Sequence, residues 1–227
     1  MDSQNIAVIV AHPDDEVLAF GGIMCRHADK GDTVQVLILA TGLAARSTTN
    51  SVDPKALASL REDTQKAAGI LGVKQVAFGD FPDNRMDTVA TLDVVRRVET
   101  FLGETGASTV YTHHAGDLNV DHAAVARAVL TACRPLPGAK VVRLYAGEVI
   151  SSSEYSLTKD RIQPTSYVNI AAYLDRKCVA LRCYRGEIRD WPHPRSVEAV
   201  QSLARSRGSE AGMEAAEALQ LLREIER

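Results

Sequence analysis

The sequence predicts an α/β protein with a three-layer, Rossmann-like fold, in which a mostly parallel sheet carries helices on both faces. Two observations support this fold class. Short, β-branched apolar runs alternate along the chain with segments of helical period. The apolar runs are continuous, which is typical of strands buried on both faces, and the connections are only a few residues long. Repeated strand–helix units with right-handed crossovers therefore account best for the pattern.

The first 150 residues hold the clearest elements. Strands are expected at residues 5–11, 33–40, 75–79, 108–112 and 140–149. Helices are expected at residues 16–30, 54–72, 88–104 and 121–133. Pro54 suits the first turn of its helix, where a missing N–H costs nothing, and Gly31 suits the position just after a helix end.

After about Ser151 the pattern loosens. A short strand is expected at 166–170, a helix at 171–183 and a helix over the last thirty or so residues, with a proline-punctuated loop at 189–196 between them. We expect a single domain over residues 1–227. In that domain, residues 151–227 form a C-terminal elaboration that lines the site.

Composition excludes several classes of partner. The chain has 227 residues, a formal net charge of −3 and a pI near 6.1, with 45% hydrophobic and 24% charged residues. We therefore expect no nucleic-acid partner and no membrane partner. The polar start of the chain predicts no signal peptide. Four widely spaced cysteines without a C-x-x-C pair predict free thiols, and together these features favour a cytoplasmic location.

Polar side chains follow the first expected strand directly, in the run AHPDDE at residues 11–16. In open α/β sheets, ligands bind beyond the carboxyl ends of the strands, which is where this run lies. Imidazole and carboxylate together suit Zn²⁺ at a site with a position open for water. His12 and Asp15 are therefore predicted metal ligands, with Asp14 as a general base. The alternative is a helix cap, but capping requires neither His12 nor three consecutive acids.

A second polar run, HHAGDLNVDH at residues 113–122, follows the strand expected at 108–112. His122, near the start of the next helix, can complete a His–Asp–His triad and leave a fourth position to water. Asp121 beside it is suited to orient an imidazole. A single histidine at a helix start can also be a surface cap. Three histidines and two aspartates within ten residues favour a site that holds one Zn²⁺ per chain.

These motifs resemble the LmbE/PIG-L family of zinc-dependent N-deacetylases. The run AHPDDE after an N-terminal strand and the later run NVDH carry the resemblance, which covers most of the chain. Further pieces match at Arg61, Phe81-Pro82-Asp83, Tyr184 and His193-Pro194-Arg195-Ser196. The resemblance implies removal of acetyl groups from N-acetylglucosamine-type sugars in glycolipids, thiol cofactors and antibiotics. It also allows a homo-oligomer.

Carried over by motif, the resemblance implies zinc on His12, Asp15 and His122. It implies that Asp14 activates the water for metal-assisted hydrolysis of a linear amide. It further implies sugar contacts at two positions, Arg61 and Asp83.

One position departs from the family pattern. Many members have His-Pro-Asp-His where this chain has Asn119-Val120-Asp121-His122. Asn119 can donate a hydrogen bond to a substrate but cannot transfer a proton. His114, or less favourably His113, can supply the missing imidazole, with Asp117 to orient it. We therefore take His114 and Asp121, with Asp14, as the candidate catalytic residues.

His193 lies in a proline-flanked loop beside Trp191. We predict that His193 lines the substrate site, with Trp191 as an apolar platform for a sugar face. The alternative is an exposed loop whose tryptophan packs on the domain.

The leading prediction is a zinc-dependent hydrolase that removes an N-acetyl or other N-acyl group from a small metabolite containing an amino sugar. A second hypothesis keeps the metal and the base but cleaves another amide, as in a sugar–thiol conjugate. A hypothesis of another class is a non-catalytic relative that binds zinc or a ligand, prompted by Asn119. Retention of Asp14 counts against it, because a binding module has no need of a base beside the metal.

Overall fold

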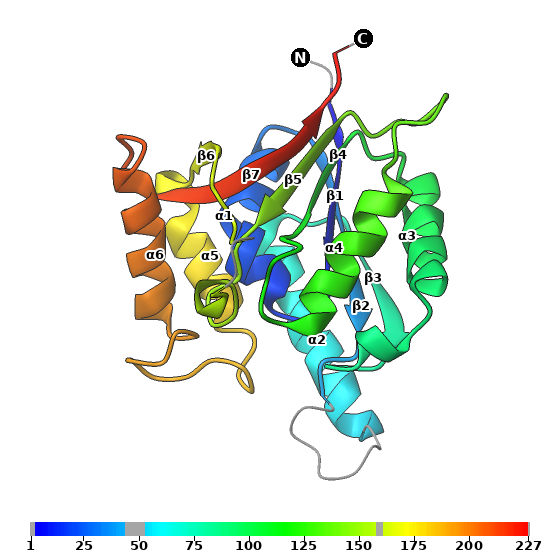
Figure 1. The fold of residues 1–227 in the computed structure, drawn as a ribbon. Helices are drawn as coiled ribbons and strands as arrows, with labels where there is room; N and C mark the ends of the chain where they lie inside the picture. The colour runs from blue at the N-terminus through cyan, green and yellow to red at the C-terminus, as the bar shows by residue number, and fades with distance from the viewer. Residues whose placement is uncertain (1–2, 44–52, 158–160, 227) are drawn as a thin grey trace.

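The computed structural model describes residues 3–43, 53–157 and 161–226, and within these ranges it forms one seven-stranded sheet (Figure 1). The strands are β1 (Asn5–Val10), β2 (Thr33–Ala40), β3 (Gln75–Phe81), β4 (Thr109–His113), β5 (Arg143–Gly147), β6 (Ser166–Asn169) and β7 (Ala216–Glu224). Their order across the sheet is β3-β2-β1-β4-β5-β7-β6. Strands β1 to β5 run parallel, whereas β7 pairs antiparallel with both β5 and β6.

Helices cover both faces of this sheet, which confirms the predicted three-layer α/β fold. One layer holds α1 (Asp15–Asp29), α2 (Pro54–Leu71), α5 (Leu174–Leu181) and α6 (Val197–Ser209). The other holds α3 (Thr91–Thr105) and α4 (Val120–Ala132). Short 3-10 turns lie at Met86–Thr88, Ser153–Tyr155 and Ala171–Tyr173. Within the described residues, no helix has both the length and the apolar character that a membrane span requires.

Strand β1 lies at the centre of the core and shows why its sequence is continuously apolar. Ile6 and Val8 pack in the cluster that includes α1, α2 and α5, whereas Ala7 and Ile9 pack with α3 and α4. All four side chains are fully buried. Because successive side chains of a strand point to opposite faces, a strand covered on both faces must be apolar at every position.

The position of β1 also determines where a site can form. It pairs with β2 on one side and with β4 on the other. The connection that leaves β1 leads to β2 on one side of it, whereas the connection into β4 leads to its other side. Such a point in an open α/β sheet leaves a crevice for a ligand. The two polar runs that follow β1 and β4 meet there.

The prediction for the last thirty or so residues is partly wrong. Residues 197–209 form α6 as expected, but Ala216–Glu224 forms β7 instead of a helix. The segment AEALQLLRE is rich in helix-forming residues, so its local preference favours a helix. Its position between β5 and β6 overrides that preference, because pairing on both sides satisfies its backbone hydrogen-bonding groups. The helix expected at 88–104 also begins later, at Thr91.

The four cysteines are free thiols, as predicted. Cys25, Cys133 and Cys178 are buried, and Cys183 is half-buried.

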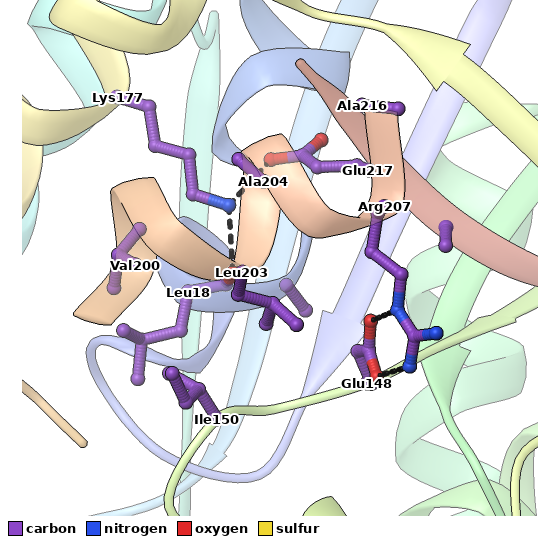
Figure 2. Close-up of a pocket in the computed structure, with 12 residues that line it drawn as sticks. Leu18, Glu148, Ile150, Lys177, Val200, Leu203, Ala204, Arg207, Ala216 and Glu217 are labelled. Atoms are coloured by element: carbon purple, nitrogen blue, oxygen red, sulfur yellow. Dashed lines mark hydrogen bonds and ion pairs between the residues drawn. The ribbon is translucent and has the colours of Figure 1, made fainter. Parts of the chain in front are cut away.

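A buried ion pair joins α1 to the C-terminal half of the chain. Lys177 and Glu217, whose side chains are 4% and 5% exposed, approach to 2.7 Å (Figure 2). Lys177 Nζ also donates to the carbonyl oxygen of Leu18, and the Glu217 carboxylate accepts from the amides of Gly22 and Ile23. Both members of the pair are therefore also hydrogen-bonded to the backbone of α1.

Glycine at positions 21 and 22 permits this close approach. A Cβ atom at Gly21 would lie 2.9 Å from Cγ of Lys177, and one at Gly22 would lie 2.6 Å from Cγ2 of Ile170. The glycines cost helix stability, about 1 kcal/mol each relative to alanine. They allow α5 and the residues before it to pack directly on α1.

The Lys177→Met substitution is expected to lower the free energy of unfolding by about 3–5 kcal/mol, because it leaves Glu217 buried without its cation. For a chain of this size that corresponds to a fall in Tm of about 6–20 °C. Lys66→Met is the matched control, since Lys66 is 58% exposed and its contact with Asp63 is long, at 3.6 Å. It should change stability by less than about 1 kcal/mol. Equal Tm values for the two variants would contradict a structural role for the buried pair.

Candidate metal centre

Three predicted metal ligands meet at the carboxyl ends of β1 and β4. His12 follows β1, Asp15 begins α1 and His122 lies in the first turn of α4. Asp15 Oδ2 lies 3.3 Å from Nδ1 of His12 and 3.2 Å from Nε2 of His122. The three side chains each offer one ligand atom, all within 4.8 Å of one another.

The donor set fits a zinc ion on two grounds. A tetrahedron with zinc–ligand bonds of 2.0–2.1 Å has edges of about 3.3–3.4 Å, close to the two separations from Asp15 Oδ2. In addition, Asp15 Oδ1 is buried and has no hydrogen-bond partner among the described residues. A buried carboxylate oxygen without a donor is costly unless a cation or water satisfies it. His12, Asp15 and His122 are thus able to hold one metal ion.

Each imidazole of the triad is supported by a carboxylate on its other nitrogen. His12 Nε2 lies 2.9 Å from Asp121 Oδ2, and His122 Nδ1 lies 3.1 Å from Asp117 Oδ1. In these positions the carboxylates face the ring nitrogens that point away from Asp15, and they would leave the opposite nitrogens available to a metal. Asp121, predicted to orient an imidazole beside His122, instead lies against His12, and its role stays a prediction.

Both supporting carboxylates are themselves held in place. Asp121 accepts from the backbone amides of Asn84 and Met86, at 2.6 and 2.8 Å. Asp117 accepts short hydrogen bonds from the hydroxyls of Ser152 and Ser153. Burial opposes ionisation of Asp117, but its contacts with His122 and the two hydroxyls lower its pKa below the ordinary value. Asp117 is therefore an anion that faces His122, whereas the sequence suggested it for orienting His114.

Asp14 adopts a backbone conformation that L-residues rarely take, with φ +103°. It stands at the N-cap of α1, yet its side chain makes no capping hydrogen bond, so the capping alternative does not describe it. Its carboxylate is buried, and Oδ2 lies 3.4 Å from Nη1 of Arg195. Burial raises the pKa of Asp14 well above the ordinary value, and Arg195 only partly offsets this. A strained, buried carboxylate of raised pKa is typical of a proton-accepting group in an active site.

His113 reaches this cluster as well. Its ring stacks on that of His122 with centroids 3.9 Å apart, and its Nε2 accepts a hydrogen bond from the amide of Ala11 at 2.8 Å. Burial and the charge of His122 lower the pKa of His113 to about 4, so the ring is neutral at pH 7. Burial also disfavours the charged form of His122, but Asp15 and Asp117 raise its pKa to about 9. His113 thus packs on the ring of His122 as a neutral imidazole.

Three further predicted residues, His114, Asn119 and Asp83, differ in their burial and in their contacts. His114 is half-buried, and its Nδ1 accepts from the amide of Gly116. Asn119 caps α4, with its Oδ1 accepting from the amide of Asp121. Asp83 is only 3% exposed, and its Oδ1 lies 3.1 Å from Nε2 of His12. The roles of these residues in catalysis and sugar binding stay predictions.

Two predicted substrate contacts lie further out. Arg61 is placed over the ring of Phe78, 5.1 Å from its centroid, and its Nε is buried without a hydrogen bond to any described residue. His193 is exposed and lines a cavity of about 440 Å³ together with Arg189 and Arg195. Trp191 beside it is 61% exposed, which leaves its ring free to contact a ligand.

Arg195 was not singled out from the sequence, although it lies in the stretch that resembles the family. Besides Asp14, it contacts Ser151 Oγ through Nε at 2.8 Å and Glu187 Oε2 through Nη1 at 3.1 Å. A single sequence gives no signal for this contact, because Arg195 and Asp14 are 181 residues apart and only the tertiary fold joins them.

Fold and site together define an α/β protein with a candidate metal centre at the carboxyl ends of its central strands. Residues 7–133 match the model of the PIG-L family, GlcNAc-PI de-N-acetylase. This match covers more than half of the chain, and the chain therefore belongs to the PIG-L family.

Individual relatives are consistent with this assignment. The chain is 30% identical over 139 residues to an uncharacterized deacetylase, YaiS, of Escherichia coli K12, covering 59% of this chain and 70% of that protein. It is 29% identical over 202 residues to a 4-oxalmesaconate hydratase of Pseudomonas putida, covering 82% and 75% respectively. The fold is similar to that of an N,N'-diacetylchitobiose deacetylase from Pyrococcus horikoshii, with a TM-score of 0.78, 18% identity and coverage of 98% and 85%.

Replacing Asp117 by alanine is expected to weaken zinc binding by about 10- to 100-fold, because His122 loses the carboxylate that holds its ring. Zinc affinity can be measured by competition with a chromophoric chelator. His12→Ala and His122→Ala should lose the metal altogether, and Asp93→Ala, on the exposed surface of α3, is the control. Wild-type affinity in Asp117→Ala would show that this carboxylate does not support a ligand.

Proposed function

We propose that this protein is a zinc-dependent hydrolase that removes an N-acetyl or other N-acyl group from a small metabolite containing an amino sugar. The observation that carries the proposal is the buried carboxylate of Asp14 beside the His12–Asp15–His122 triad. A site that only stored or sensed a metal would have no use for an additional strained carboxylate of raised pKa.

When bound, zinc would polarise an amide carbonyl and lower the pKa of water from 15.7 to about 7. His12, Asp15 and His122 would hold the ion, and Asp117 and Asp121 would keep the two rings aligned. Asp14 would accept a proton on its carboxylate and later return it to the leaving amine. Arg195 would fix the Asp14 carboxylate, since it also binds Ser151 and Glu187 from the C-terminal half of the chain.

The substrate class rests on the relatives and on the rim of the site. Deacetylases appear both among the related sequences and among the related folds. Arg61, His193 and the exposed Trp191 would contact the sugar, with Asn119 as a hydrogen-bond donor near the reacting group. A small soluble substrate and a cytoplasmic location complete the proposal.

A second candidate function is hydration of an unsaturated carboxylic acid. Two observations favour it: the hydratase match spans 82% of this chain, and Arg189, His193 and Arg195 line the 440 Å³ cavity with groups that suit carboxylates. Hydration also needs no protonation of an amine leaving group, which agrees with asparagine at position 119.

Asp14→Asn is expected to lower kcat for acetate release by about 10²–10⁴-fold, because the amide cannot accept a proton. Zinc content should stay near one per chain. The assay measures amine release from a panel that includes N-acetylglucosamine and its simple glycosides. Wild-type turnover by Asp14→Asn would remove this residue from the mechanism. Hydration of 4-oxalmesaconate by wild-type protein, with no amine release from any member of the panel, would select the second candidate.

Arg195→Ala is expected to lower kcat by about 10- to 100-fold with a smaller change in KM, because the Asp14 carboxylate loses the side chain that fixes it. Arg195→Lys should recover part of the loss. Arg189→Ala is a matched control, since Arg189 lines the same cavity but donates to the carbonyl oxygens of Gly186 and Ile188. If both alanine variants changed only KM, Arg195 would be a substrate contact and not a positioning residue.

A further inference from the structure

Glu16, the last residue of the run AHPDDE, has no part in the proposed mechanism, yet it is buried and only 3% exposed. Its Oε2 accepts a hydrogen bond from the backbone amide of Asp14 at 3.0 Å. Its Oε1 accepts one from the hydroxyl of Tyr184. Each oxygen therefore has a donor, as a buried carboxylate requires. One of these donors belongs to the main chain of the proposed base.

The main chain of Asp14 depends on such support. Its φ of +103° and ψ of −30° lie outside the regions that L-residues ordinarily adopt, and a conformation of this kind persists only where the surrounding structure fixes it. The carbonyl oxygen of Asp14 accepts from the amides of Val17 and Leu18, at 3.0 and 2.9 Å. The amide has no carbonyl partner within α1, because it stands at the helix N-terminus. Glu16 supplies the missing acceptor, so Asp14 is held at both its amide and its carbonyl group.

Glu16 is held in turn by a residue that lies 168 positions later in the chain. Tyr184 follows α5 and is fully buried, and its ring packs in the same apolar cluster as the buried side chains of α1. A hydrogen bond from a hydroxyl to a carboxylate is stronger than one between two neutral groups. Because the ring cannot move without repacking of the core, its hydroxyl fixes the direction of the Glu16 side chain.

The turn that contains Tyr184 also holds the other end of Asp14. The amide of Glu187 donates to the carbonyl oxygen of Tyr184 at 2.9 Å, which closes the turn at residues 184–187. Glu187 Oε2 accepts from Arg195 Nη1, and this nitrogen lies 3.4 Å from Asp14 Oδ2. One turn of the C-terminal half thus acts on the main chain of Asp14 through Glu16, and on its carboxylate through Arg195.

We propose that Glu16 and Tyr184 are positioning residues, which hold Asp14 in its strained main-chain conformation and so direct its carboxylate at the reacting group. This inference rests on the proposed function for the role of Asp14 as the base. Neither residue needs to touch the substrate, since both act through the Asp14 amide. A shift of about 1 Å in the carboxylate is enough to lower the rate by about 10²-fold.

Tyr184→Phe keeps the buried ring and removes only the hydroxyl. It should lower kcat for acetate release by about 10- to 100-fold, with little change in KM and with zinc content unchanged. Tyr111→Phe is the matched control, because Tyr111 is also buried and its hydroxyl also bonds one side chain, His27 Nε2 at 2.9 Å. His27 lies near the far end of α1, so this variant should keep the wild-type kcat.

Two substitutions of Glu16 distinguish positioning from packing. Glu16→Ala removes the acceptor of the Asp14 amide and should lower kcat at least as much as Tyr184→Phe. Glu16→Gln keeps an oxygen for the amide, and its NH₂ group can donate to the hydroxyl of Tyr184. It should therefore recover part of the loss. Circular dichroism and zinc content establish that each variant is folded and loaded.

A double-mutant cycle tests whether Tyr184 acts through Asp14. In an Asp14→Asn background the base is already lost, so Tyr184→Phe should cause little further decrease in the residual kcat. An equal decrease in both backgrounds would mean that the hydroxyl supports the fold in general, and would overturn the proposal. Wild-type kcat in both Tyr184→Phe and Glu16→Ala would overturn it as well, and would leave the proposed hydrolysis intact.

Amide hydrogen exchange tests the same contact without any substrate. In the zinc-loaded protein, exchange at the amide of Asp14 should be about tenfold faster in Glu16→Ala, because a hydrogen bond to a charged group is lost. The increase should be smaller in Tyr184→Phe and absent in Tyr111→Phe. Unchanged exchange in the first two variants contradicts the inference. If wild-type protein releases no amine from any substrate, the proposed function fails, and exchange still decides whether Glu16 and Tyr184 hold Asp14.

Discussion

The parallel pairing of β1 with β4 is the interaction on which the rest of the site depends. It brings together two strands that are about one hundred residues apart, with Ile9 opposite Thr112. Just after β1, the amide of Ala11 adds a hydrogen bond to the ring of His113 at the end of β4. Because both strands run in the same direction, the two polar runs emerge at one edge of the sheet, and α1 and α4 begin there. Without this register, the metal ligands would lie on separate parts of the surface.

The second constraint is electrostatic. Asp15, Asp83 and Asp121 all approach His12, and Asp14 and Asp117 lie close by. So many carboxylates in a largely buried space repel each other, and the protein meets this cost in two ways. Backbone amides and serine hydroxyls hold individual carboxylates, and Arg195 adds one positive charge from the C-terminal half. A divalent cation bound at Asp15 would offset part of this repulsion.

The fold and the clustering of His12, Asp15 and His122 could be predicted from the sequence because both depend on short patterns. Continuous apolar runs mark buried parallel strands, and polar residues directly after them mark the ligand-binding edge. The partners that come from distant segments could not be predicted. Arg195 and the serines that hold Asp117 carry no local pattern, and the composition of Ala216–Glu224 favours a helix where strand pairing is stronger. Local propensity describes the chain in isolation, whereas these positions are determined by neighbours that only the completed sheet provides.

The buried pair of Lys177 and Glu217 has a consequence for the order in which the molecule can be completed. Glu217 accepts from the amide of Gly22, which lies 195 residues earlier in the chain. Chain synthesis on the ribosome proceeds at about 5–20 residues per second. Glu217 therefore becomes available to α1 only well after α1 itself has been made. The helix that begins with Asp15 reaches its final packing only after nearly the whole sheet has been made.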